Sequence, residues 1–444
     1  MKPPKPEPNV DESLDSNSPE KDLSDYKPLD FQPDSSPTPS HTEHPKTLEA
    51  KGLNVAIVAR RFWPLAGSTE FAVGDLADAL NSKGHHVNIL TIRWERNWPS
   101  DFHYRESPVR RINRPVSGPW GSYRYLRNLN QTLGEYPLDG IVVFGLDEEA
   151  WSIAKAYGGK IPFVIRIDNH LLGDKSGQPS LNSRQITSLA AADKILCESR
   201  WTAERLLNHP SVASTSIASK ISVCPDPIHI SVNHQRSPAR QGSARIAVSD
   251  AHPILMIEPT QPLVICGAPM NGDNGLNDLV NSWTRVLKRH PKARLWIIGE
   301  GKKSRKVWDR INDKHLVNSV IMPGSFDDLD DVFQAADLYV HPLRSDESCS
   351  ILARAMTAGV CSIVTDTRAT RDLIQPSTDG NDFINGIVVK PGDNAALTEA
   401  MLLALGNKDM RDRLGRAAAR STANTYDAST VLHDFIDTFV SLNE

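Results

Sequence analysis

Short apolar runs alternate with amphipathic segments along most of the chain. Val55–Ala59 is a continuous apolar run, which is typical of a parallel strand covered on both faces. Residues 68–83 follow with apolar side chains at helical spacing, a serine or threonine that can cap the start, and Gly84 after the end. The pattern predicts a strand, a glycine-containing loop and a helix.

The same alternation continues along the first half of the chain. Further apolar runs predict short strands at 87–90, 141–144, 162–165 and 194–197. Residues 201–207 predict a helix after the last of these strands. We therefore expect one doubly wound α/β domain over residues 51–230.

The pattern then breaks and starts again. Residues 231–261 have little regular apolar spacing and contain a Pro, Gly and Ser cluster, which predicts a linker. A second doubly wound domain is expected over residues 262–425, with a helix that starts near Leu276. Its predicted strands are 263–266, 295–298, 338–340, 362–364 and 387–389. Residues 426–444 predict a C-terminal helix, and packing against the first domain is one arrangement open to it.

The first 50 residues differ from the rest of the chain. They hold ten of the 31 prolines and only two aromatic residues, with many Ser, Asp and Glu. Such a composition cannot bury a core, so residues 1–50 are expected to form a disordered tail. A solvated extension is favoured over a regulatory or tethering role.

Composition narrows the class of protein. A chain of 444 residues with 39 % hydrophobic and 23 % charged residues fits two soluble domains. The net charge of -4 gives no general attraction to nucleic acid, and none is expected as a partner. Five cysteines without CxxC spacing favour a reducing, cytoplasmic setting. No run of about 18 apolar residues and no secretory signal is present, so we expect neither a spanning helix nor export.

Ligands of open α/β sheets bind at the carboxyl ends of the strands, where helix N-termini present unpaired N–H groups to anions. In this chain those strand ends carry residues 64–68, 299–301, 323–326 and 341–352. We expect the chemistry of the protein to lie there, in a cleft shared by the two domains.

Eight short segments follow one another in order within residues 53–425. They are Phe62–Gly67, Lys83–Val87, Ala192–Ser199, Ile221–Ile228, Trp296–Gly301, Pro323–Asp327, Ala335–Pro342 and Ala355–Gly359. The ordered set resembles family 4 of the glycosyltransferases. The resemblance implies the GT-B fold, in which two Rossmann-like doubly wound domains face a central cleft.

The resemblance also implies an activity. Members of the family are retaining transferases that move a sugar from a nucleoside diphosphate sugar to an acceptor hydroxyl, without a cofactor or an obligatory metal. A hexosyltransferase of polysaccharide or glycoconjugate biosynthesis is implied, with a sugar or a lipid-linked molecule as acceptor. Peripheral membrane contact stays open, although no basic or amphipathic face stands out in the sequence of the first domain.

Residue roles follow from the matched segments. His170 resembles the family's histidine near the reacting sugar, and Asp346 its first carboxylate, with Glu347 beside it as a second candidate. Gly67 and Ser68 would start one helix that faces the diphosphate. The remaining implied donor-binding residues are Gly275, Gly299, Gly301, Ser325, Phe326, Arg344, Ser350, Ile351, Leu352 and Arg354.

Two departures from the family pattern concern the donor site. The family places a second carboxylate, which holds the ribose hydroxyls, where this chain has Arg354, and a guanidinium cannot accept hydrogen bonds. The Arg and Lys that the family directs at the diphosphate are absent from residues 267–275. Two missing charge-assisted contacts of about 1.5–3 kcal/mol each would slow transfer by several orders of magnitude. The basic residues that could compensate are Arg60, Arg61, Lys302, Lys303, Arg344 and Arg354 itself.

Two functions of different classes are therefore weighed. The favoured one is an active transferase with an altered donor site. The alternative is a catalytically inactive relative that serves as a binding or regulatory protein. A dinucleotide-dependent oxidoreductase is disfavoured, because no GxGxxG motif follows the first strand of either domain.

Overall fold

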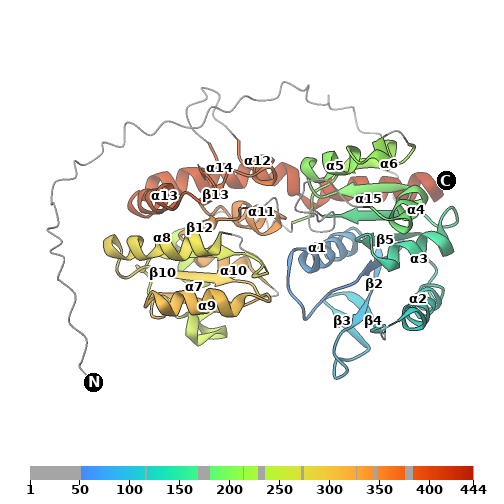
Figure 1. Cartoon of the computed structure of the whole chain (residues 1–444), viewed down its shortest axis with the longest axis horizontal. Coiled ribbons are helices and arrows are strands. Elements are labelled where there is room, and N and C mark those ends of the chain that lie inside the picture. Colours follow the sequence, from blue (N-terminus) through green and yellow to red (C-terminus); the bar gives the residue numbers. More distant parts are fainter. Residues whose placement is uncertain are drawn as a thin grey trace, which may run out of the picture.

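The computed structural model describes residues 52–115, 118–168, 181–213, 215–228, 236–271, 275–326, 328–344, 348–375 and 384–443. They form two α/β domains that lie side by side (Figure 1). The N-terminal domain comprises residues 52–228 together with the last helix, and the C-terminal domain comprises residues 236–426. The predicted fold class, two Rossmann-like domains, is thereby confirmed.

The N-terminal domain is built on an eight-stranded sheet of order β3-β4-β2-β1-β5-β6-β7-β8. Its strands are β1 (Asn54–Ala59), β2 (His86–Arg93), β3 (Asp101–Tyr104), β4 (Ser107–Asn113), β5 (Gly140–Phe144), β6 (Phe163–Ile167), β7 (Lys194–Cys197) and β8 (Ile221–Val223). Its helices are α1 (Ser68–Ser82), α2 (Pro119–Leu133), α3 (Glu148–Tyr157), α4 (Ser183–Ala191), α5 (Arg200–Leu207) and α6 (Pro210–Ala213). Neighbouring strands pair in parallel except β3 and β4.

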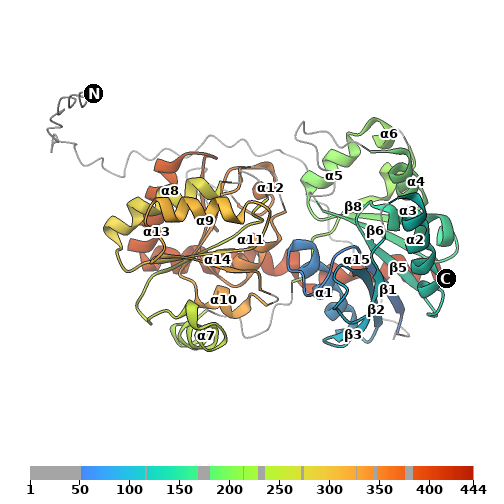
Figure 2. The same cartoon turned by 60° about the horizontal axis from the view of Figure 1, so that its bottom comes forward.

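The C-terminal domain has a parallel sheet of order β11-β10-β9-β12-β13-β14. Its strands are β9 (Leu263–Gly267), β10 (Arg294–Ile298), β11 (Val320–Gly324), β12 (Leu338–His341), β13 (Ser362–Thr365) and β14 (Ile387–Val389). Its helices are α7 (Pro238–Ala251), α8 (Leu276–Arg289), α9 (Ser304–Asp313), α10 (Asp330–Ala335), α11 (Ser350–Thr357), α12 (Arg368–Arg371), α13 (Asn394–Gly406) and α14 (Lys408–Tyr426). Figure 2 shows helices on both sides of this sheet.

The apolar runs of the sequence form the central strands. All residues of β9 are buried, and so are all residues of β1 except the first. Helices cover both faces of each sheet. Strands with this double coverage need apolar side chains at consecutive positions, which is the pattern that the sequence shows. Burial on both faces thus explains why these strands could be predicted.

One segment predicted to be a linker contains a helix. Within residues 231–261, α7 begins after Ser237, whose side chain accepts a hydrogen bond from the backbone N–H of Arg240. The buried Arg245 of α7 donates to the carbonyls of Ala335, Glu258, Pro259 and Gln261 and pairs with Asp337. A helix that buries an arginine between only two apolar side chains, Ala244 and Val248, has a weak apolar pattern, so periodicity does not reveal it.

The chain returns to the N-terminal domain through its last helix, α15 (Ala428–Asn443). Val431, Leu432, Phe435 and Phe439 of this helix are buried in the core of the N-terminal domain. Phe439 lies directly over Gly140, where an added Cβ would be 2.4 Å from the ring. Among the described helices, none is both long enough and apolar enough to cross a membrane.

Candidate functional site

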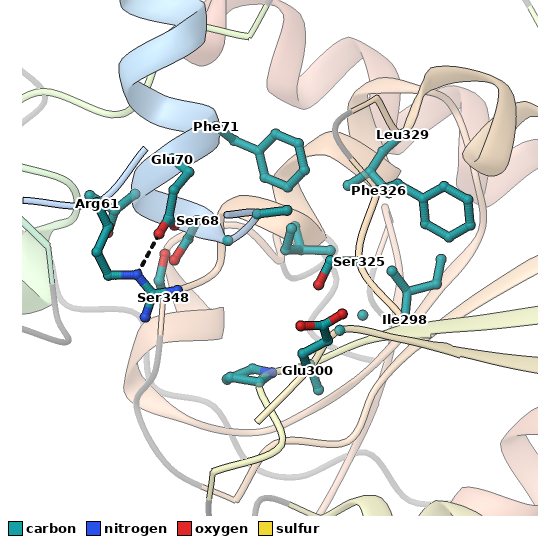
Figure 3. Close-up of a pocket in the computed structure, with 18 of the residues that line it drawn as sticks. Arg61, Ser68, Glu70, Phe71, Ile298, Glu300, Ser325, Phe326, Leu329 and Ser348 are labelled. Carbon is teal, nitrogen blue, oxygen red and sulfur yellow. Dashed lines mark ion pairs between the residues drawn. The ribbon is translucent and has the colours of Figure 1, made fainter. Parts of the chain in front are cut away.

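A cavity of about 340 Å³ lies between the two domains. The N-terminal domain contributes the loop after β1 and the first turn of α1. The C-terminal domain contributes the carboxyl ends of β9, β10, β11 and β12 and the first turn of α11. Figure 3 shows side chains from both domains pointing into the same space. The strand ends that the sequence singles out therefore do meet at one cavity.

On the N-terminal side, Gly67 and Ser68 line the cavity. The first hydrogen bond of α1 runs from the N–H of Phe71 to the carbonyl of Gly67, at 2.9 Å. No side chain caps this helix start among the described residues, so its first N–H groups are available to an anion. A Cβ at Gly67 would lie 2.6 Å from Oε2 of Glu70, so a larger residue there would have to displace that carboxylate.

On the C-terminal side the cavity has an apolar wall. Phe326, Leu329 and Phe333 line it together with Ile298 and Ile351. Aromatic and aliphatic side chains of this kind suit the face of a nucleobase. Figure 3 shows Phe326, Leu329 and Ile298 on the same side of the cavity.

Polar groups stand beside this wall. Glu300 follows Gly299 at the end of β10, and Ser325 follows β11; Figure 3 shows their side chains facing the same part of the cavity. Gly299 has φ +125°, and a Cβ there would lie 2.3 Å from the carbonyl oxygen of Ala268. Glycine at this position therefore lets two backbone segments approach and places Glu300 at the cavity.

His341 ends β12 at the floor of the cavity and is buried. Burial lowers the pKa of His341 to about 4, so its imidazole is neutral near pH 7. Its Nδ1 lies 3.4 Å from the hydroxyl of Tyr339, which donates to the carbonyl of Gly267 at 3.2 Å. A neutral histidine here can hydrogen-bond a ligand but adds no positive charge.

Positive charge reaches the cavity from the N-terminal domain. In the part of the chain that the structure describes, the lysines and arginines that line it are Arg60 and Arg61. Arg61 pairs with Glu70 at 2.8 Å, drawn as the dashed line in Figure 3. Arg60 lies 3.4 Å from Glu149 and 3.7 Å from Asp147. Both arginines were among the compensating residues that the sequence suggested.

Other predicted donor-binding residues do not line the cavity. Arg344 donates twice to Asp278, at 2.7 Å from both Nε and Nη2, and Leu352 is buried in the core. A Cβ at Gly275 would lie 1.8 Å from the carbonyl oxygen of Pro342, and one at Gly301 would lie 2.4 Å from that of Met270. These two glycines allow close backbone contacts. Lys302 and Lys303 are also absent from the lining.

Arg354 points towards the N-terminal domain. It forms an ion pair with Asp75 of α1, and its guanidinium carbon lies 4.9 Å from the centre of the Phe71 ring. The two charged side chains are only 12 % and 11 % exposed. Burial lowers the pKa of Arg354 to about 10, which leaves it charged near pH 7. With Ser350, Arg354 lines a second pocket of about 340 Å³ between the domains.

The predicted catalytic residues His170 and Asp346, and Glu347 beside Asp346, lie outside the described residues. Asp168, two residues before His170 in the sequence, accepts a hydrogen bond of 2.8 Å from the hydroxyl of Thr69 in α1. Ser348, the residue after Glu347 in the sequence, donates a hydrogen bond of 2.9 Å to Glu198 and lines the cavity. The roles of the three residues stay predictions.

Sequence reasoning did not single out several residues of the cavity. Glu300 and His341 lie in strand ends that were expected to carry the chemistry, but no rule picked these two side chains from their loops. Phe71 lies outside the buried apolar face of α1 and packs against the core of the C-terminal domain instead. For these residues only the position of the opposite domain shows that they face a ligand site.

Two doubly wound domains around a cavity built from strand ends and helix starts define a GT-B glycosyltransferase architecture. The chain belongs to the group 1 glycosyltransferases: residues 249–421 match the family model "Glycosyl transferases group 1", and residues 67–216 match "Glycosyl transferase 4-like domain". The resemblance found in the sequence is confirmed.

The individual relatives share low sequence identity with this chain. The sulfoquinovosyl transferase SQD2 of Arabidopsis thaliana is 24 % identical over 165 residues, which are 37 % of this chain and 31 % of that protein. The phosphatidyl-myo-inositol mannosyltransferase of Mycobacterium leprae is 29 % identical over 160 residues, 35 % of this chain and 40 % of that protein. The matches thus span less than half of the length of either relative.

Solved structures show the same fold. The structure of Anabaena Alr3699/HepE in complex with UDP and glucose superposes with a TM-score of 0.67 and 15 % sequence identity. The match covers 88 % of this chain and 100 % of that one. At this identity the likeness shows the architecture alone.

Proposed function

We propose that the protein is a retaining, metal-independent hexosyltransferase that moves a sugar from a nucleoside diphosphate sugar to an acceptor hydroxyl. The observation that carries the proposal is the interdomain cavity, which combines an apolar wall, an uncapped helix start and two arginines. Anabaena HepE, which has this fold, was solved with UDP and glucose. A nucleoside diphosphate contains a flat base, hydroxyl groups and a dianion, and the cavity offers a partner for each.

The nucleoside would bind on the C-terminal side. The base would stack against Phe326 and Leu329. Glu300 would accept hydrogen bonds from ribose hydroxyls, with Ser325 beside it, because Arg354 cannot take that role. A carboxylate in the loop after β10 would then replace the carboxylate that the family has on α11.

The diphosphate would lie between the helix starts. The N–H groups at the start of α1 and that of Ile351 at the start of α11 would face it. Arg61 would leave or share Glu70 and pair with a phosphate oxygen. Positive charge from the N-terminal domain would thus take the place of the Arg and Lys that residues 267–275 lack.

In the transfer step, the bond between the anomeric carbon and the diphosphate oxygen breaks, and a bond from the acceptor oxygen to that carbon forms on the same face. The acceptor proton leaves with the departing diphosphate or to a nearby base. Helix N–H groups and Arg61 stabilise the charge that develops on the leaving group. His170 and Asp346 are proposed to lie near the sugar.

The acceptor is proposed to be a sugar or a lipid-linked molecule of polysaccharide or glycoconjugate assembly. Both curated relatives named above are glycosyl-transferring enzymes, and the name of one contains a phosphatidylinositol. A cytoplasmic location is part of the same proposal, because cytoplasm supplies nucleoside diphosphate sugars.

Thermal stabilisation of the purified protein by a panel of nucleoside diphosphates and their sugars tests this function. A ligand at 100 times its Kd adds about 2.7 kcal/mol to the free energy of unfolding. We expect one nucleotide to stabilise the protein, and its sugar to be released or transferred on incubation. No stabilisation by any nucleotide would overturn the proposal, and binding without turnover would support the inactive alternative.

A further inference from the structure

Helices α8 and α9, with the loops beside them, carry many exposed basic side chains of the C-terminal domain. The two helices connect consecutive parallel strands, β9 to β10 and β10 to β11, so they lie on the same side of the sheet. They also pack against each other, as Figures 1 and 2 both show. The exposed basic residues, which we call the basic face, are Arg285, Lys288, Arg289, Lys292, Lys302, Arg305, Lys306 and Arg310.

The charge of the basic face is not balanced by acids nearby in the sequence. Residues 285–315 contain eleven arginines and lysines but only three acidic residues, a net charge of +8, whereas the whole chain has a net charge of -4. Arg305 pairs with Asp309 at 2.9 Å, and Arg310 donates to Asn281 at 2.9 Å. The other six members form no ion pair within the described residues. Like charges gathered on one side of a domain produce a potential that attracts an anionic partner.

The same chain contains a segment of opposite charge. Residues 1–50 hold eleven acidic residues and five lysines, a net charge of -6, and nine of these acids fall within residues 7–34. The composition predicts no core for this segment, so its carboxylates are expected to remain exposed to a partner. Negative and positive charge are therefore segregated along this chain into an acidic segment, residues 7–34, and the basic face.

We propose that the acidic segment docks on the basic face of the same molecule. Opposite net charges select this pair of surfaces. The chain is long enough, because about 30 residues between the middle of the acidic segment and Gly52 span up to about 100 Å when extended. Two domains of this size side by side measure about 80 Å. The covalent tether gives the acidic segment an effective concentration in the millimolar range, which favours it over an anion that diffuses freely.

The docking is electrostatic, and many pairings contribute to it. The basic side chains are long and exposed, and serines and prolines separate the acids along residues 7–34, so no single ion pair is required. Exposed charges are screened over about 8 Å at physiological ionic strength and over about 3 Å in 1 M salt. Salt should therefore release the acidic segment. The docking goes beyond the proposed transferase function and uses no residue that lines the donor cavity.

Carbodiimide crosslinking of the full chain tests the docking, because the reagent joins a carboxylate directly to an amine without a spacer. In low salt, the carboxylates of residues 7–34 should react mainly with Lys288, Lys292, Lys302 and Lys306, and 1 M NaCl should abolish these crosslinks. Lys83 is the comparison. A Cβ at Gly52 would lie 2.4 Å from the carbonyl oxygen of Gly84, so Lys83 is exposed close to the point where the segment joins the N-terminal domain. A segment that does not dock would react most with Lys83.

The arginines of the basic face can be changed while its lysines report, because arginine does not react with the reagent. Arg285→Gln, Arg289→Gln and Arg305→Gln together should lower the yield of crosslinks to the basic face about tenfold, since each exposed charge contributes a factor of about 1.5–5.

The N-terminal domain supplies the matched control. Arg96→Gln, Arg124→Gln and Arg127→Gln remove the same charge from exposed positions and should leave the yield unchanged. All of the altered side chains are exposed, so both triple variants should keep the melting temperature of the unaltered protein.

Three results would overturn the proposal. The first is Lys83 as the main partner of residues 7–34, and the second is an equal loss of crosslinks in the two triple variants. The third is crosslinks that join two molecules in a mixture of labelled and unlabelled protein, because the acidic segment would then dock on a second copy. Crosslinks within one molecule that salt and the basic-face variant both remove would establish the docking.

Discussion

Asp75 of α1 and Arg354 of α11 connect the two domains, and the change Asp75→Asn tests how strongly. The substitution keeps the size of the side chain and removes its charge. Arg354 would then remain buried against Phe71 without a counter-ion. An arginine keeps its proton in proteins, so Arg354 cannot avoid the penalty by becoming neutral near pH 7.

Removing one partner of a buried ion pair costs about 3–5 kcal/mol. Separation of the domains would let water reach Arg354, so the cost should appear as a shift from closed to open arrangements. A change of about 3 kcal/mol alters that equilibrium about 150-fold. Nucleotide affinity should fall as well, because the cavity needs both domains.

Small-angle X-ray scattering measures the result directly. We expect a larger radius of gyration for Asp75→Asn at an unchanged melting temperature of the individual domains. Asp78→Asn, one turn along α1, is the control, because Asp78 pairs with Arg105 of the same domain. Adding Arg354→Met to Asp75→Asn should restore the compact form, since methionine packs well on an aromatic ring. Identical scattering for Asp75→Asn and the unaltered protein would refute the reasoning.

Three further outcomes are expected. Arg61→Gln should weaken binding of a nucleoside diphosphate about tenfold, measured by calorimetry. This is the lower end of the range for a lost charge-assisted contact, because Arg61 is half exposed. Binding of the nucleoside alone, which has no phosphate, should not change. Gly299→Ala should lower the free energy of unfolding in urea by about 1–3 kcal/mol, because Gly299 has a φ of +125° and lies against the Ala268 carbonyl. Gly242→Ala is the control and should not lower it, because Gly242 lies in α7 with open space around it. His341 binds its proton less readily in the folded protein, where its pKa is about 4, than in the unfolded chain, where it is 6.5. Stability should therefore fall as the pH drops from about 6.5 to about 4, by about 3 kcal/mol from this residue, and His341→Gln should flatten that part of the urea-unfolding profile.

Much of the fold follows from local sequence pattern. The central strands β1, β5, β9 and β10 lie where consecutive apolar residues predict them, and α1 begins at Ser68 as its spacing predicts. Strands β3 and β4 were not predicted. β3 is the edge strand and β4 lies next to it; β4 mixes polar with apolar residues, including two consecutive arginines, and contains a proline. Edge strands lack the double coverage that makes a run continuously apolar.

The donor cavity was predictable in outline and not in detail. Glycine positions such as Gly67 and Gly299 could be chosen from the sequence, because a strand end followed by glycine marks a ligand-binding loop in this type of domain. The same rule also selected Gly301, and the family resemblance implied Gly275. Both glycines serve backbone contacts outside the cavity lining. A loop motif identifies the strand end but not which of its residues faces the cavity.

The sequence by itself determined the two-domain α/β class, the family and the loss of a carboxylate at Arg354. Each of these depends on residue type and order along the chain. Only the tertiary structure decided that Arg354 pairs with Asp75, that Arg60 and Arg61 supply positive charge to the cavity lining, and that Trp120 and Tyr123 face outwards from α2. The reason is physical: an ion pair or an exposed face depends on which element of a distant part of the chain packs alongside, and local periodicity carries no record of that choice.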